Sequence, residues 1–289
     1  MICNQCPRKC NVERSKYTGR CGVGEKFKIA RADLHFWEEP CISGKNGSGT
    51  VFFSGCNLGC VFCQNYEISH RCIGRDVESD ELVRIFEALI SKGANNINLV
   101  NPTHYARQIS EVLKNWSSPV PIVYNSSGYE SVETLKLLDG LVDIYLPDFK
   151  YIVPEKAKKY SLAEDYPEAS MLALAEMKRQ VGEGVFENGL MKKGMIIRHL
   201  VLPSNTNASI KALDYLAENY RDTYISVMAQ YTPCGDLEGF EEINRSLTKR
   251  EYNKIVDYAL SLGLEKIFIQ DLSSASESFI PQFSENFEY

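Results

Sequence analysis

Short apolar runs alternate with amphipathic segments from Thr50 to the end of this 289-residue chain, and this alternation restricts the fold more than any other feature. Short apolar runs between turn residues are typical of buried strands, and the segments between them carry helical spacing. Such an alternation predicts a parallel sheet with helices on its faces. We predict strands at residues 50–54, 97–100, 122–125, 142–146, 195–202, 224–230 and 267–270.

Helices are predicted between several of these strands from capping residues and apolar spacing. Ser79 is the predicted N-cap of a helix that Gly93 ends, and Thr248 with Glu251 forms the capping box of a last helix before Gly263. Further helices are predicted at residues 105–115 and 132–138, and twice within residues 153–193. Six consecutive units are fewer than the eight of a full barrel, so we predict an incomplete (β/α)6 parallel TIM-like barrel with functional loops at the carboxyl ends of its strands.

The loop after the first of these strands holds three thiols, Cys56, Cys60 and Cys63. This spacing lets one glycine-containing loop turn the three sulfurs toward a common point, as a metal or an iron-sulfur cluster requires. A closed zinc or cubane site usually takes four protein ligands, so three thiols leave one position for water or a substrate. Their occurrence together argues against the alternative of buried cysteines that pack as small hydrophobes.

The first 49 residues are predicted to be a cysteine-rich segment and a connector, separate from the barrel unit of residues 50–289. Four closely spaced thiols predict a second metal centre in this segment, and the spacing does not choose between zinc and an additional iron-sulfur cluster. Its ligands would be Cys3, Cys6, Cys10 and Cys21. The alternative is a set of reduced thiols on a frayed terminus. Residues 27–49 show little periodicity and contain three glycines near their end, which predicts a flexible or tightly turned connector.

Composition limits the partners of the protein. The 38 acidic residues outnumber the 32 basic ones, and a net charge of -6 disfavours nucleic acid and anionic membranes as partners. No apolar run approaches the roughly 20 residues that span a bilayer, and no secretion signal opens the chain. Ten clustered cysteines without such a signal favour metal binding in a reducing compartment, so we predict a cytoplasmic protein with a protein or small-molecule partner.

Polar side chains recur where successive predicted strands end. Each has an ordinary explanation as a turn former, a surface pair or a helix cap, but their recurrence at one end of the sheet favours a shared site. They are Asn101 to His104, Asn125 to Tyr129, Asp148, Lys150, Arg198, His199, Gln230 and Tyr231.

The Cys-x3-Cys-x2-Cys spacing, with aromatic Phe62 before the last cysteine and a strand before the first, resembles the signature of radical S-adenosylmethionine (SAM) enzymes. The resemblance implies a [4Fe-4S] cluster on Cys56, Cys60 and Cys63 whose fourth iron is chelated by SAM. It also implies that reductive cleavage of SAM yields a 5'-deoxyadenosyl radical, which abstracts a hydrogen atom while the protein orients the reactants.

Residues 50–231 further resemble the activating enzymes of pyruvate formate-lyase and related glycyl-radical enzymes. This resemblance implies a protein or peptide substrate such as a glycyl-radical enzyme, an electron donor such as flavodoxin or ferredoxin, and a monovalent cation beside SAM. The implied cofactor-binding residues are Phe62, Asn101, Asn125, Ser126, Asp148, Lys150 and Arg198. The chain departs from that group after the second predicted strand, where Asn101-Pro102-Thr103-His104 replaces a Gly-Gly-Glu-Pro motif that contacts the methionyl amino group.

We therefore predict a radical SAM oxidoreductase that abstracts hydrogen from a protein or peptide, with the installation of a glycyl radical as one outcome. Within the enzyme class, a radical SAM peptide maturase or methyltransferase is an alternative. Outside it, the alternative is a non-catalytic iron-sulfur or zinc protein that transfers electrons or binds a partner.

Overall fold

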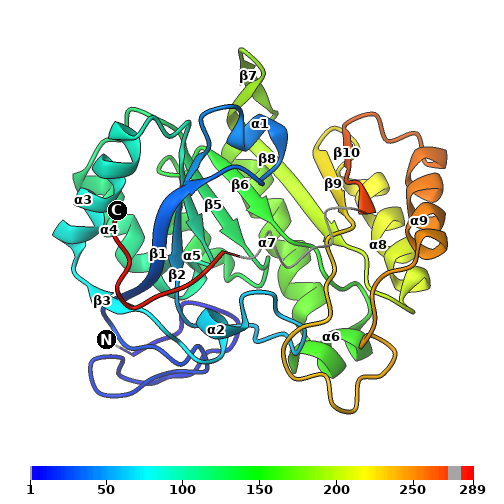
Figure 1. Cartoon of the computed structure of the whole chain (residues 1–289), viewed down its shortest axis with the longest axis horizontal. Coiled ribbons are helices and arrows are strands. Elements are labelled where there is room, and N and C mark those ends of the chain that lie inside the picture. Colours follow the sequence, from blue (N-terminus) through cyan, green and yellow to red (C-terminus); the bar gives the residue numbers. More distant parts are fainter. Residues whose placement is uncertain (1, 273–280) are drawn as a thin grey trace.

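The computed structural model describes residues 2–272 and 281–289, which form a central sheet with helices packed against it (Figure 1). The strands are β1 (Phe27–His35), β2 (Ser48–Phe53), β3 (Arg75–Val77), β4 (Ile97–Val100), β5 (Ile122–Ser126), β6 (Ile144–Pro147), β7 (Val185–Glu187), β8 (Leu190–Leu200), β9 (Tyr224–Met228) and β10 (Ile267–Ile269). The α-helices are α1 (Pro40–Ser43), α2 (Tyr66–Ser69), α3 (Ser79–Ser91), α4 (Ala106–Asn115), α5 (Val132–Leu135), α6 (Pro154–Ser161), α7 (Tyr166–Val181), α8 (Thr206–Asn219) and α9 (Lys249–Ser261). Two 3-10 helices, η1 (Thr103–Tyr105) and η2 (Lys136–Leu138), adjoin α4 and α5.

The strands lie in the order β10-β9-β8-β6-β5-β4-β2-β1-β3, and β7 pairs with β8 outside this path. From β2 to β10 neighbouring strands of this order pair in parallel. The two strands at the other edge, β1 and β3, pair antiparallel. In the described part of the chain the sheet ends at β10 and β3 without closing. The predicted mostly parallel α/β fold is confirmed, and each of the predicted strands is present.

Both faces of the sheet are covered, which explains why the strand sequences are apolar runs. Every residue of β2, β4, β5 and β6 is buried, as expected for parallel strands between two layers. On one face α3 packs its buried side chains, including Leu82, Ile85 and Phe86. On the other face Ile42 of α1 packs in an apolar cluster with side chains of β5, β6 and β8.

The prediction of a connector at residues 27–49 is wrong. This segment contains β1, which pairs antiparallel with β2 from Ile29 to His35, and α1. The pairing joins residues that are distant along the chain, so no local periodicity signals it. Helix α8 and the hairpin of β7 with β8 were not predicted, and Glu78 instead of Ser79 is the N-cap of α3. The capping box of Thr248 and Glu251 on α9 is confirmed.

Residues 281–289 return across the first strand of the sheet, where they are drawn in red in Figure 1. The backbone amide of Ser284 donates to the carbonyl of Ala30 at 3.1 Å, and the ring of Phe283 contacts that of Phe52 with centroids 5.4 Å apart. This end of the chain therefore packs on the antiparallel edge. In the described residues, no helix combines the length and the apolarity needed to cross a membrane.

Candidate active site at the carboxyl ends of the strands

A cavity of about 570 Å³ lies at the carboxyl ends of the parallel strands. The three thiols of the loop after β2 line it, and so does every residue for which the sequence predicts cofactor binding. These residues are Cys56, Cys60, Cys63, Phe62, Asn101, Asn125, Ser126, Asp148, Lys150 and Arg198. The fold thus brings together side chains from β5, β6, β8 and the cysteine loop, and their roles there stay predictions.

The cysteine loop is held by backbone contacts that require glycine at position 55. Gly55 has a φ of +86°, and a Cβ at this position would lie 2.5 Å from the carbonyl oxygen of Cys21, so a larger residue would be strained and would clash. The next amide, that of Cys56, donates to the same Cys21 carbonyl at 3.1 Å. The side chain of Asn101 donates to the Gly55 carbonyl from the end of β4.

Two of the three sulfurs accept hydrogen bonds, as the ligands of an iron-sulfur cluster commonly do. The backbone amide of Leu58 donates to Cys56 Sγ at 3.4 Å, and Ser161 Oγ donates to Cys60 Sγ at 3.0 Å. Burial, followed by the nearby Cys63 and Cys60 thiols, raises the pKa of Cys56 to about 12. Burial and the neighbouring Cys60 thiol likewise raise the pKa of Cys63 to about 11, and closely spaced thiols on a single buried loop suit a set of ligands for a cationic centre.

No group of three or more His, Cys, Asp or Glu side chains has the arrangement of a single-ion metal site within residues 2–272 and 281–289. A single ion such as zinc needs all its sulfurs at about 2.3 Å from one centre. A cubane cluster instead takes each thiolate on a different iron. The finding on single-ion sites therefore does not test the cluster that the spacing of the loop predicts, whose ligation by three thiols stays a prediction.

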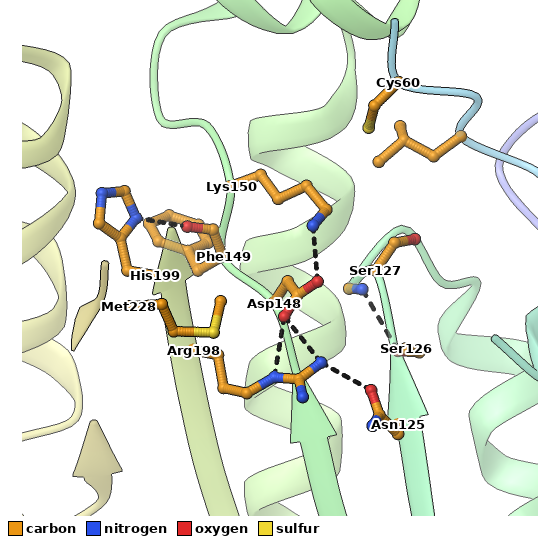
Figure 2. A network of polar contacts seen from close by, with 12 residues as sticks. Cys60, Asn125, Ser126, Ser127, Asp148, Phe149, Lys150, Arg198, His199 and Met228 are labelled. Carbon is orange, nitrogen blue, oxygen red and sulfur yellow. Dashed lines mark hydrogen bonds and ion pairs between the residues drawn. The ribbon is translucent and has the colours of Figure 1, made fainter. Parts of the chain in front are cut away.

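Charged side chains from the strand ends form a network beside the thiols (Figure 2). Asp148 accepts from Arg198 Nε at 2.9 Å and from Lys150 Nζ at 2.6 Å, while Arg198 also donates to Asn125 Oδ1 at 2.6 Å. In Figure 2 the ammonium of Lys150 points to Asp148, and Lys150 also interacts electrostatically with Cys60. Burial alone would raise the pKa of Asp148, but Arg198 and then Lys150 outweigh it and hold that pKa below its ordinary value. Asp148 is therefore an anion between two cations.

Two glutamates that sequence reasoning missed belong to this site. Glu38 and Glu39 lie between β1 and α1 and line the same cavity. Glu38 accepts from Arg198 at 3.3 Å, and also from Asn98 at 3.2 Å and Asn125 at 3.1 Å. No local sequence pattern predicts the position of these two glutamates. Only the long-range pairing of β1 with β2 brings their segment to the cavity.

The two histidines near the strand ends do not line the cavity. The ring of His104 is 3% exposed and its Nε2 lies 2.8 Å from the carbonyl oxygen of Ser54. The ring of His199 is turned to the carbonyl oxygen of Phe149, with Nδ1 at 2.7 Å (Figure 2). Both side chains therefore support the backbone near the site. Gln230 and Tyr231 do line the cavity.

The N-terminal cysteine segment docks on the cysteine loop through Arg8. The guanidinium donates to the carbonyls of Asn57 at 2.9 Å and Leu58 at 3.1 Å, and to those of Ser161 at 2.9 Å and Leu162 at 2.6 Å. It also lies over the Tyr129 ring, 5.2 Å from the centroid. Asn57 and Leu58 stand between Cys56 and Cys60, so Arg8 fixes the backbone that carries two of the three thiols.

The four N-terminal thiols lie in this docked segment. Burial raises the pKa of Cys21, and the nearby Cys3 and Cys10 thiols raise it further. The backbone amide of Arg20 donates to Cys10 Sγ at 3.2 Å. The thiols are thus close enough to interact electrostatically, and a second metal centre on them stays a prediction.

Comparison with known proteins gives three findings. Residues 50–186 match the model of the radical SAM superfamily. An uncharacterised protein of Methanocaldococcus jannaschii, MJ0674, is 31% identical over 278 residues, an alignment that covers 92% of this chain and 76% of that protein. The crystal structure of methylornithine synthase (PylB) is similar with a TM-score of 0.48 at 14% identity, covering 96% of this chain and 79% of that one.

Proposed function

Because this chain belongs to the radical SAM superfamily, we propose that its cavity binds a [4Fe-4S] cluster through Cys56, Cys60 and Cys63, together with SAM. When bound, these groups supply the one-electron reductive cleavage of SAM to a 5'-deoxyadenosyl radical that abstracts a hydrogen atom. One observation carries the proposal: three thiols of one loop and a charged network from three strand ends line the same cavity.

The charged network is proposed to bind the carboxylate of SAM. Asp148 already contacts two cations, Arg198 and Lys150, so its own charge is balanced and it is a poor ligand for a monovalent cation. An anion is the better partner, since Lys150 Nζ carries three donors and Asp148 uses one of them. Asp148 acts here as a positioning residue that holds both cations.

The remaining cavity residues are proposed to bind the rest of SAM. Phe62 presents an aromatic side chain whose ring lies 5.8 Å from that of Tyr231 and 6.2 Å from that of Tyr160, between centroids. Asn101, at the end of β4, has a left-handed backbone with a φ of +59° and borders the same cavity. Asn125 and Ser126, at the end of β5, complete the polar lining.

For the substrate we propose a protein or peptide, with activation of a glycyl-radical enzyme as the first candidate and flavodoxin or ferredoxin as the electron donor. The resemblance of residues 50–231 to the glycyl-radical activating enzymes supports this, and Asn125, Asp148, Lys150 and Arg198 are the strand-end residues for which it implies SAM binding. The second candidate is a radical SAM peptide maturase or methyltransferase. The replacement of Gly-Gly-Glu-Pro by Asn101-Pro102-Thr103-His104 favours this second candidate.

We also propose a second thiolate centre, zinc or iron-sulfur, on Cys3, Cys6, Cys10 and Cys21, although these side chains, as the structure describes them, are not arranged around a single ion. The contact of the Cys56 amide with the Cys21 carbonyl supports a structural link between such a centre and the catalytic loop. Four thiols gathered in one docked segment repel one another once they lose their protons, and a bound cation would relieve this repulsion, which is the physical reason to expect one.

Anaerobic turnover tests the enzyme proposal. Full-length protein loaded with iron and sulfide is expected to form 5'-deoxyadenosine from SAM when dithionite is added. Cys60→Ala should lose the cluster absorption and this product, because one iron is left without its thiolate. Cys41→Ala is the matched control, since Cys41 is a buried thiol packed in an apolar cluster away from the loop. Absence of 5'-deoxyadenosine from cluster-loaded protein would favour the non-catalytic iron-sulfur alternative.

A further inference from the structure

The floor of the cavity contains a carboxylate that the proposed cofactor contacts leave unused. Glu39 is 7% exposed and lines the cavity, and within the described residues its Oε2 atom has no hydrogen-bond partner. Ser226 Oγ also lacks a partner within normal hydrogen-bond geometry among these residues, but it lies near Glu39: burial raises the pKa of that carboxyl, and the Ser226 hydroxyl lowers it by a smaller amount. Buried carboxylate oxygens are almost always hydrogen-bonded in native proteins. The Ser226 hydroxyl can offer Glu39 one donor, but a buried carboxylate accepts several hydrogen bonds, so Glu39 still has room for a donor that a ligand supplies.

The charges around the cavity indicate the sign of that ligand. The described residues that line it include four carboxylates, Glu38, Glu39, Asp148 and Asp271, but only two cations, Lys150 and Arg198. Asp148 contacts both cations and Glu38 contacts Arg198, so Glu39 has to share a cation that is already paired twice. A buried carboxylate in this position favours a cationic ligand.

The position of Glu39 separates this ligand from SAM. The amino and carboxylate groups of SAM have to reach the cluster at Cys56, Cys60 and Cys63. Arg198 contacts Asp148 on one side and Glu38 on the other, so the glutamates lie beyond the Asp148–Arg198 pair from Lys150, the cation that interacts electrostatically with Cys60. A cationic group bound at Glu39 would therefore belong to a second ligand and not to SAM.

We propose that Glu39 and Ser226 bind the protonated primary amine of the substrate. An ammonium group is a compact charge with three N–H donors, which suits one free carboxylate oxygen and one hydroxyl, whereas a guanidinium prefers two parallel acceptors. A single metal ion is disfavoured, because in the described residues no three acidic, histidine or cysteine side chains are arranged to hold one ion. Apolar side chains that also line the cavity, among them Val100, Met228 and Phe268, suit the carbon chain that carries the amine.

This inference rests on the proposed function only in that the amine belongs to the molecule from which hydrogen is abstracted. Binding can be measured without turnover. The probe is n-pentylamine, which is protonated at pH 7.5, and 1-pentanol is its neutral isostere. Each is titrated calorimetrically into full-length, cluster-loaded, SAM-saturated protein.

The parent protein is expected to bind pentylamine at least ten-fold more tightly than pentanol. Glu39→Gln should abolish this preference and leave the affinity for SAM unchanged. Glu130→Gln is the matched control, because Glu130 is an equally buried carboxylate that does not line the cavity, and it should keep the preference. Should Glu39→Gln not fold, Ser226→Ala is expected to reduce the preference several-fold.

Three results would overturn the inference. They are equal binding of amine and alcohol by the parent, an undiminished preference in Glu39→Gln, or a ten-fold loss of SAM affinity in that variant, which would assign Glu39 to the SAM amino group. Failure of the proposed function is distinguishable, because it would appear as an amine preference without 5'-deoxyadenosine formation.

Discussion

At the scale of single residues, Asp148 shows how a side chain acts through its neighbours. Asp148→Asn leaves Lys150 and Arg198, both nine-tenths buried or nearly so, without the anion that separates them. We expect the affinity for SAM to fall about ten-fold, because Lys150 and Arg198 then repel each other and are no longer held in place to bind its carboxylate. The cluster should remain. Calorimetric titration of SAM measures the change.

Asp257→Asn is the control for this prediction, since Asp257 is exposed on α9. The titration is repeated in sodium and in potassium buffers. If the SAM affinity depends on whether sodium or potassium is present, the assignment of the SAM carboxylate to Lys150 is wrong. A monovalent cation beside SAM would then be the better explanation.

Glu130 gives the protein a predicted dependence of stability on pH. Burial raises its pKa from 4.5 to about 7, against the hydrogen bonds from Thr103, Ser126 and Tyr124. The folded state therefore binds a proton between pH 4.5 and 7 that the unfolded state releases, so stability falls as pH rises through this range. The loss due to this group should approach about 3 kcal/mol above pH 7.

Urea denaturation of the full chain at several pH values tests this dependence. Glu130→Gln cannot ionise and should flatten the profile between pH 5 and 8, while Glu111→Gln, an exposed substitution on α4, should leave it as in the parent. A Glu130→Gln profile as steep as that of the parent would show that Glu130 does not titrate in this range.

At the scale of elements, the N-terminal segment stabilises the cysteine loop through one side chain. Arg8→Met keeps the apolar stem but removes every hydrogen bond from the guanidinium to the carbonyls of Asn57, Leu58, Ser161 and Leu162. Hydrogen bonds to a charged donor contribute roughly 1.5–3 kcal/mol each, so we expect a more mobile loop and a several-fold faster loss of the cluster to a chelator. The decay of visible absorption under anaerobic conditions measures it.

Lys9→Met is the control for Arg8, because Lys9 is its exposed neighbour in the same turn. Equal decay rates in Arg8→Met and Lys9→Met would mean that the loop holds its conformation without the guanidinium.

Elements whose signal is local were predicted well. The strands at residues 97–100 and 122–126 and the capped helix α9 follow from apolar runs and a capping box. Strand β1 was not predicted, because its extended backbone is stabilised by pairing with β2 and not by a local sequence pattern. The glycines near residues 44–49 indicated a turn instead. Those glycines do turn the chain, but they do so between α1 and β2.

At the scale of the whole molecule, metal content distinguishes the two kinds of N-terminal centre. Anaerobically prepared full chain should contain about eight iron atoms if both thiol sets hold cubane clusters, or about four iron atoms and one zinc if they differ. Cys10→Ser should lower only the second contribution, since Cys10 lies outside the cavity. Iron near four without zinc in both proteins would mean that the N-terminal thiols bind no metal.

The site residues that follow a predicted strand, or lie near its end, were predictable from the sequence. Asp148, Lys150 and Arg198 follow or lie within predicted strands, and the parallel order alone places such residues at one edge. Glu38 and Glu39 were not predictable, because they reach the cavity through a segment with no periodicity. The excess of carboxylates over cations in the cavity can be recognised only when the fold shows which residues line it.

The contacts of Arg8 also set an order of events during biosynthesis. Two of its acceptors, the carbonyls of Ser161 and Leu162, come about 150 residues later in the chain. At the usual 5–20 residues per second, a ribosome needs roughly 10–30 s to reach them. During that interval Arg8 lacks these two acceptors. The N-terminal segment can thus complete its contacts only after residues 161–162 have been made, which is before β8, β9 and β10 follow.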